Sequence, residues 1–158
     1  TIFDHHTVEF EYEGGFRLLS QCCQIGGKCQ RDVREHFHGL KGTANLAANG
    51  RFLINGQLPG GKRARNKTDA YQIEHDAFFE NIRTGGYRND AEYAAHSTLM
   101  AVMGRMATYT GQVITWDQVM NSRENLAPDN LTWDSEPPVK PDADGWYPVA
   151  VPGTTLPL

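Results

Sequence analysis

The chain has 158 residues and a formal net charge of −4, with hydrophobic residues at 39% and charged residues at 22%. This length and composition are typical of one soluble domain that is large enough to bury a core. The small negative charge gives no uniform field for polyanions, so we expect no nucleic-acid partner. No apolar run approaches the roughly 18 residues that a bilayer-spanning helix needs, so we expect no membrane partner.

The first third of the chain predicts antiparallel strands. Residues 6–12 alternate between apolar and polar side chains, the pattern of a strand with one buried face. Gly14-Gly15 predicts a turn into a returning strand at residues 16–23. Further strands are expected at residues 33–38, 43–46 and 51–55. On the strand at 33–38, the side chains of Arg34, His36 and His38 are expected to form a polar face.

Three consecutive helices are expected between residues 71 and 120. Apolar side chains recur with a helical period in residues 71–82 and again in 95–106. Gly85 and Gly111 are placed to end these two helices, because glycine adopts the left-handed cap conformation without a steric clash.

The helix starts carry capping signals. Asp90 is placed to cap the second helix. Thr115 and Gln118 have the spacing of a capping box for the third, and Ile114 can pack onto Val119 as a hydrophobic staple.

Strands followed by helices predict an α+β fold, a mostly antiparallel open sheet with helices packed on one face. The other face is expected to meet water or a partner. We assign residues 1–127 to this domain. Residues 128–158 are rich in proline and tryptophan, so we expect an extended arm of the same domain that lies on it or on a neighbouring subunit.

A glycine-rich and basic segment follows the strands. Residues 56–62 match the first seven positions of a phosphate-binding loop, but Arg63 stands where Ser or Thr should ligate Mg²⁺. Lys62, Arg63, Arg65 and Lys67 lack neighbouring aromatic residues that would stack on bases. A solvated loop is the better interpretation of both patterns.

Cysteines and histidines suggest metal binding only weakly. Cys22, Cys23 and Cys29 could be ligands, but Cys22 and Cys23 are adjacent on a strand and point to opposite faces, so these two cannot readily share one ion. Buried or half-buried thiols and surface histidines at His36 and His38 are the simpler interpretation, and we expect no metal. The odd number of cysteines also favours a reducing compartment.

Two histidine clusters leave their role open. Asp4, His5 and His6 gather at a strand start with no nucleophile beside them in the sequence, so we do not predict catalysis there. His75 lies on an apolar helical stripe, one turn after Tyr71. It either satisfies its ring by a hydrogen bond against the sheet or faces a cleft.

One longer pattern resembles a known family. It comprises Tyr71, Glu74, His75, Asp76, Phe78, Ile82, Arg83 and Gly85, then Ser97, Thr98, Leu99, Met103, Gly104, Arg105, Ala107, Tyr109, Thr110, Gly111, Gln112, Ile114, Thr115 and Trp116. This pattern resembles the C-terminal domain of the Gfo/Idh/MocA oxidoreductases, most strongly a dehydrogenase subgroup of planctomycete-like bacteria. Shorter matches at residues 3–5, 39–43 and 148–153 extend the resemblance over nearly the whole chain.

The resemblance implies a division of labour. In that family an N-terminal Rossmann domain binds NAD or NADP and supplies a lysine from a Glu-Lys-Pro motif. This chain has neither the dinucleotide-binding fingerprint nor that motif. We therefore expect the Rossmann domain upstream of Thr1, and no catalytic or cofactor-binding residue in this chain.

The function implied is that of a substrate-binding and oligomerising domain. The parent would be an NAD(P)-dependent dehydrogenase acting on a sugar, polyol or related hydroxy compound, and the isolated domain would be inactive. A stand-alone protein-interaction module with an open sheet face is the alternative. The bacterial cytoplasm is the favoured compartment, and the periplasm is the alternative if an upstream segment carries a signal.

The same resemblance points to four substrate-binding residues. Gln30 and Arg31 occupy the position where the family's strand enters the active cleft, and Tyr71 and His75 would approach that cleft from the first helix. Arg31 has a forked set of donors suited to a hydroxyl or carboxylate. Its alternative is an ion pair with Asp32 or Glu35 in solvent, where it would matter little.

Overall fold

The computed structural model describes residues 2–47, 51–58, 69–128 and 130–156. The chain divides into two units: residues 1–27 together with 90–158, and residues 28–89. Each unit is described by itself. In the described part of the chain, no helix is both long and apolar enough to cross a membrane.

The first unit begins with a hairpin. Strands β1 (His5–Glu11) and β2 (Arg17–Cys23) pair antiparallel, in a register that runs from His5 opposite Cys23 to Glu11 opposite Arg17. The short 3₁₀ turn η1 (Glu13–Gly15) joins them, and both of its glycines have a positive φ, as the predicted turn requires. Burial alternates along β1, which confirms that the strand has one buried face.

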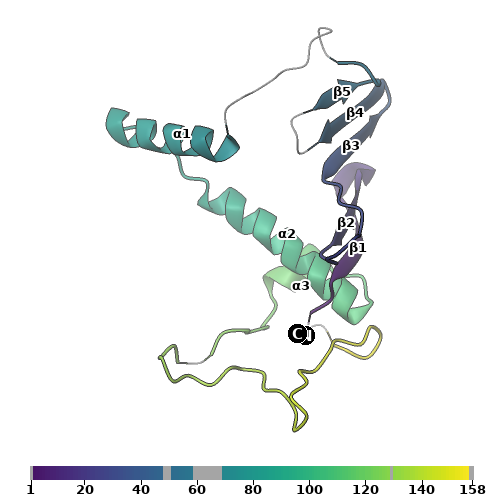
Figure 1. Cartoon of the computed structure of the whole chain (residues 1–158), viewed down its shortest axis with the longest axis vertical. Helices are drawn as coiled ribbons and strands as arrows, with labels where there is room; N and C mark the ends of the chain where they lie inside the picture. The colour runs from purple at the N-terminus through teal and green to yellow at the C-terminus, as the bar shows by residue number, and fades with distance from the viewer. Residues whose placement is uncertain (1, 48–50, 59–68, 129, 157–158) are drawn as a thin grey trace. The chain divides into compact units, whose positions relative to one another are not determined.

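Helices α2 (Ala91–Thr110) and α3 (Trp116–Met120) follow in this unit (Figure 1). Met106, Ile114 and Val119 are its buried apolar core, so the predicted contact of Ile114 with Val119 is confirmed as part of a larger cluster. Gly111 ends α2 in the left-handed conformation, with φ of 68°. The capping box is also confirmed, because Thr115 Oγ1 accepts from the Gln118 amide at 3.2 Å and Gln118 Oε1 accepts from the Thr115 amide at 2.8 Å.

Asp90 occupies the N-cap position of α2, but its side chain makes no capping hydrogen bond. Its backbone carbonyl accepts from the Ala94 amide at 2.8 Å. The sequence thus located the helix start correctly, while the predicted side-chain cap is wrong. The backbone of Asp90, at φ −97° and ψ 9°, is outside the extended region from which a cap side chain reaches the first turn.

Strand β1 packs on α2 at a glycine. A Cβ at Gly104 would lie 3.1 Å from the ring of Phe10 and 3.6 Å from the side chain of Val8. The hydroxyl of Tyr12 also contacts the sulfur of Met100 at 3.0 Å. The absence of a side chain at Gly104 therefore sets how closely the strand approaches the helix.

The tail after α3 contains no regular element in its described residues, as its prolines predict. Near its end it contacts the C-terminal end of α2. The Gly153 amide donates to the carbonyl of Thr110 at 2.7 Å, and Pro152 packs against Gly111. The arm therefore contacts its own domain at the C-terminal end of α2.

The second unit holds a three-stranded antiparallel sheet. Its strands are β3 (Arg34–Gly39), β4 (Gly42–Ala47) and β5 (Phe52–Ile54), with β4 in the centre. The Asn55 side chain accepts from the Thr43 amide at 2.8 Å, and the Asn55 amide donates to the Thr43 carbonyl at 2.9 Å. This double contact fastens the end of β5 to the start of β4.

Helix α1 (Ala70–Thr84) belongs to the same unit. Asp69 caps its start by accepting from the Tyr71 amide at 3.0 Å, and Gly85 ends it with φ of 68°. The predicted stop at Gly85 is confirmed.

The α+β class and the antiparallel, open character of the sheet are confirmed. One feature differs from the prediction, because the strands form two sheets instead of one. Alternation of side chains shows which residues form strands but not which strands pair. The ten residues 24–33 between β2 and β3 hold no strand, so the chain can leave one sheet before it starts the next.

Candidate functional site

Gln30 and Arg31 lie in the irregular segment that leads into β3, and both are exposed. The carboxylate of Asp32, the next residue along the chain, is paired with another arginine. Arg34 holds Asp32 through two contacts of 2.6 Å, one from Nε and one from a terminal nitrogen. A bidentate pair of this kind occupies both carboxylate oxygens. The guanidinium of Arg31 is thus not the group that holds Asp32.

Tyr71 and His75 lie in the first two turns of α1. The side chain of Tyr71 is 73% exposed, so its hydroxyl is accessible. The Nδ1 of His75 lies 2.7 Å from the Tyr71 carbonyl, which can only accept, so Nδ1 carries the proton. When the ring is neutral, Nε2 remains as an acceptor. The histidine is therefore satisfied within its own helix, without the predicted partner on the sheet.

The four residues form two pairs along the chain, because Gln30 and Arg31 are adjacent in sequence and His75 contacts Tyr71 one helical turn away. Among the described residues, no hydrogen bond, ion pair or ring contact joins the pair Gln30–Arg31 to the pair Tyr71–His75. Their placement around one cleft stays a prediction.

The phosphate-loop pattern and the basic cluster fall mostly outside the described residues, since residues 59–68 are not described. Gly56 and Gln57 are described, and they form a turn in which Ile54 and Gln57 exchange backbone hydrogen bonds of 2.9 Å.

A second candidate is an aromatic and ionic cluster at the end of α2. The ring of Phe3 lies 4.7 Å from that of Tyr109, and the guanidinium of Arg105 lies 5.5 Å from the Tyr109 centroid. Arg105 also forms a half-buried ion pair with Glu124. His6 stacks on Tyr109 at 6.1 Å. These contacts pack the residues around β1 and the start of the tail against α2, which is a structural role.

The orientation of His6 follows from its partner. Its Nδ1 lies 2.8 Å from the hydroxyl of Thr108, and that hydroxyl donates to the Arg105 carbonyl at 3.0 Å. Because the hydroxyl proton is used there, Nδ1 of His6 is the donor. His6 is thus tied to the helix.

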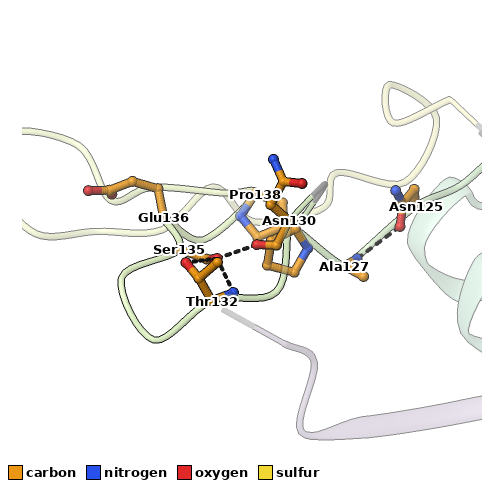
Figure 2. Close-up of a pocket in the computed structure, with 8 residues that line it drawn as sticks. Asn125, Ala127, Asn130, Thr132, Ser135, Glu136 and Pro138 are labelled. Atoms are coloured by element: carbon orange, nitrogen blue, oxygen red, sulfur yellow. Dashed lines mark hydrogen bonds between the residues drawn. The ribbon is translucent and has the colours of Figure 1, made fainter.

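The tail contains an open pocket of about 610 Å³ (Figure 2). Its lining residues are Asn125, Ala127, Pro128, Asn130, Thr132, Ser135, Glu136 and Pro138. Figure 2 shows that Ser135 organises one wall, since its hydroxyl accepts from the Thr132 amide at 2.7 Å and donates to the Asn130 carbonyl. These bonds stabilise a turn of the tail. The pocket offers amide and hydroxyl groups with a single carboxylate, which suits a polar ligand but assembles no acid–base pair.

The strand register brings together residues that the sequence keeps apart. His5 Nδ1 lies 2.6 Å from a carboxylate oxygen of Asp4, and Cys23 is directly opposite His5 on β2. In the sequence, no nucleophile stands beside Asp4 and His5. The register of the hairpin supplies one.

Cys22, Cys23 and Cys29 are free and exposed, so the expectation of buried or half-buried thiols is wrong. All of β2 is exposed, so neither face of this strand is covered at its cysteines. The described residues contain no group of three or more His, Cys, Asp and Glu side chains arranged to hold a metal ion. His36 is paired with Asn45, its neighbour across the β3–β4 ladder.

No family model, no curated protein and no solved structure matches this chain.

Proposed function

We propose that this chain is the substrate-binding and oligomerising domain of an NAD(P)-dependent oxidoreductase of the Gfo/Idh/MocA type. Its substrate would be a sugar, a polyol or a related hydroxy compound. The observation that carries the proposal is the long residue pattern over α1, α2 and the start of α3, at the spacing that the family uses. An α+β fold with open antiparallel sheets is compatible with it.

The chemistry explains why such a domain needs a partner domain. Hydride transfer requires a nicotinamide held against the substrate carbon and an acid–base group for the hydroxyl proton. The sequence supplies no phosphate-binding fingerprint after a strand and no Glu-Lys-Pro motif. The Rossmann domain that supplies both would precede Thr1 in the parent protein.

This chain would contribute hydrogen-bond donors and acceptors that line one side of the substrate site, which we call the substrate wall. Arg31 offers a forked set of N–H groups whose neighbouring carboxylate, Asp32, is already held by Arg34. Tyr71 offers an exposed hydroxyl, and His75 offers an unprotonated Nε2 that can accept from a substrate hydroxyl. Gln30 adds an amide that both donates and accepts. Polyols present several hydroxyl groups, so a mixed set of donors and acceptors suits them.

Open sheet faces also favour a second role in assembly. Phe37 is 54% exposed on the face of β3 opposite Arg34, His36 and His38, and burying its ring against a partner would remove apolar surface from water. We propose a symmetric homo-oligomer that forms on an open sheet face.

The experiment begins with the parent gene. The region upstream of Thr1 is sequenced, and the whole parent protein is purified and assayed with NAD⁺ and NADP⁺ against a panel of sugars and polyols. Reduction of either cofactor by a panel member supports the proposal. A parent without a dinucleotide-binding domain overturns it and leaves the protein-interaction module as the better hypothesis.

A further inference from the structure

The start of β1 and the end of β2 carry three chemically active side chains outside the proposed substrate wall. They are Asp4, His5 and Cys23. The hairpin register sets how close they are. The Asp4 carbonyl accepts from the Gln24 amide at 2.7 Å, so Asp4 and Gln24 form a hydrogen-bonded pair.

Pairs alternate along an antiparallel ladder between hydrogen-bonded and non-hydrogen-bonded types. The other end of the hairpin agrees, since the Tyr12 amide donates to the Phe16 carbonyl at 2.9 Å. His5 and Cys23 lie next to the Asp4–Gln24 pair and therefore form a non-hydrogen-bonded pair. In such pairs the Cα atoms are only about 4.5 Å apart and the side chains are closest.

The two side chains share one face of the hairpin because directly opposite residues point the same way. That face is the exposed one, since His6, Val8 and Phe10 are the half-buried residues of β1. Both His5 and Cys23 are exposed. A thiol on this face is accessible to a small molecule.

The contact of His5 with Asp4 sets which ring nitrogen can act as a base. Its Nδ1 lies 2.6 Å from the Asp4 carboxylate, which accepts when ionised, so Nδ1 carries the proton. Nε2 is then the acceptor. A carboxylate that fixes the tautomer of a histidine beside a nucleophile is the arrangement that activates serine and cysteine nucleophiles in unrelated folds.

Cys22 provides a contrast within the same strand. It is opposite His6 in a hydrogen-bonded pair, where the side chains are farther apart. His6 donates its Nδ1 proton to Thr108 on α2, and no carboxylate of the described residues contacts its ring. The hairpin therefore gives two neighbouring cysteines different surroundings.

We propose that Cys23 is a nucleophilic thiol that undergoes exchange with low-molecular-weight disulfides, with His5 as its base and Asp4 as the residue that positions His5. His5 Nε2 accepts the proton of the Cys23 thiol, and the sulfur attacks one sulfur of the small disulfide. The S–S bond of the small disulfide breaks as the mixed disulfide with Cys23 forms. The departing thiolate takes the proton from His5, so Cys23 is oxidised and the departing half is reduced.

The test uses the reduced full chain and an aromatic disulfide, 5,5′-dithiobis(2-nitrobenzoate), under conditions where this probe is limiting. Peptide mass spectrometry of quenched samples gives the rate of mixed-disulfide formation separately for Cys22, Cys23 and Cys29. Cys23 should react fastest. His5→Gln should slow Cys23 by at least about tenfold, a modest share of what general base catalysis supplies.

The controls separate chemistry from loss of structure. Asp4→Asn should slow Cys23 and leave Cys22 unchanged, because it removes only the group that orients His5. His38→Gln, the same change on an exposed strand in the other unit, should leave the Cys23 rate unchanged. Three equal cysteine rates would overturn the proposal. So would a His5→Gln variant in which Cys23 keeps its rate, or in which Cys22 and Cys23 slow equally.

Discussion

At the scale of single residues, the proposed substrate-binding role can be tested by changing one side chain at a time. The Arg31 guanidinium and the Tyr71 hydroxyl are two of the groups with donors to offer a bound polyol. In the full parent enzyme, with its substrate identified, Arg31→Ala and Tyr71→Phe should each lower kcat/KM by at least about tenfold, or roughly 1.4 kcal/mol of transition-state binding. NAD(P) affinity should not change, because the cofactor would be held by the other domain.

A matched control exists on the same segment. Arg34 is two residues beyond Asp32 and is committed to it, so Arg34→Ala should affect kcat/KM less than Arg31→Ala. Parental kcat/KM in both the Arg31 and the Tyr71 variants would show that other residues line the cleft.

The capping box of α3 is a second residue-scale feature. Thr115→Ala removes the acceptor for the Gln118 amide and should lower the free energy of unfolding by about 1 kcal/mol. Chemical denaturation of the full chain measures the change. Gln118→Ala removes the reciprocal bond to the Thr115 amide and should cost less, because a backbone donor there can bind water. A midpoint for Thr115→Ala within error of the parent would contradict this account.

At the scale of elements, the contact of β1 with α2 depends on the missing side chain of Gly104. Gly104→Leu would place its Cβ 3.1 Å from the Phe10 ring and push the remaining atoms into the strand. Overpacking of this kind typically costs about 1–3 kcal/mol. The free energy of unfolding of the variant should fall by that amount, measured by denaturant titration.

Two further variants make this prediction specific. Phe10→Ala in the Gly104→Leu background should recover part of the loss, since it removes the ring that the leucine meets. Ala101→Leu, at an exposed position of the same helix, should have little effect. If Gly104→Leu has the same free energy of unfolding as the parent, β1 can shift on α2 without loss of stability, and the close contact is not required.

The elements also show what a sequence can and cannot reveal. Gly85 and Gly111 end their helices as predicted, because the left-handed conformation of a helix cap depends on a single residue and glycine adopts it without a steric clash. The Thr115–Gln118 box is equally local. The Asp90 side chain, by contrast, does not cap, and the division into two sheets was not predicted, because both depend on backbone geometry and pairing set by distant residues.

The candidate sites divide in the same way. Arg31 and Tyr71 were singled out from a resemblance, and their exposure does not by itself assign a role. Cys23 was considered only as a metal ligand, since its neighbour His5 is eighteen positions away along the chain. Only the register of the hairpin brings them together. Gly14-Gly15 predicts a hairpin, but which residues of the two strands lie opposite each other depends on the exact length of the turn.

At the scale of the whole molecule, the first expectation concerns the cofactor. The isolated chain should not bind NADH or NADPH, because it lacks the glycine-rich fingerprint that a pyrophosphate requires. Calorimetric titration with each cofactor should give no binding heat. A micromolar dissociation constant for either one would contradict the proposed division of labour between two domains.

The second expectation concerns assembly. We expect the chain to form a homodimer or a larger symmetric oligomer in solution, because its sheets have faces that no described element covers fully. Multi-angle light scattering at micromolar concentration gives the molar mass. Phe37→Ser, a polar change on an exposed strand, should shift the equilibrium toward monomer if that face is the one used. A strict monomer at every concentration would argue against assembly by this chain.

The return of the tail to α2 has a consequence for the energy balance of the chain end. The roughly 30 residues between α3 and Gly153 form a loop whose closure costs about 3 kcal/mol of chain entropy. The Gly153 amide contributes one net hydrogen bond, about 1 kcal/mol, and Pro152 contacts Gly111 while it stays exposed. This hydrogen bond offsets only part of the entropy cost, so other contacts of the tail, such as the ion pair of Glu124 with Arg105, are needed to hold the chain end on the domain.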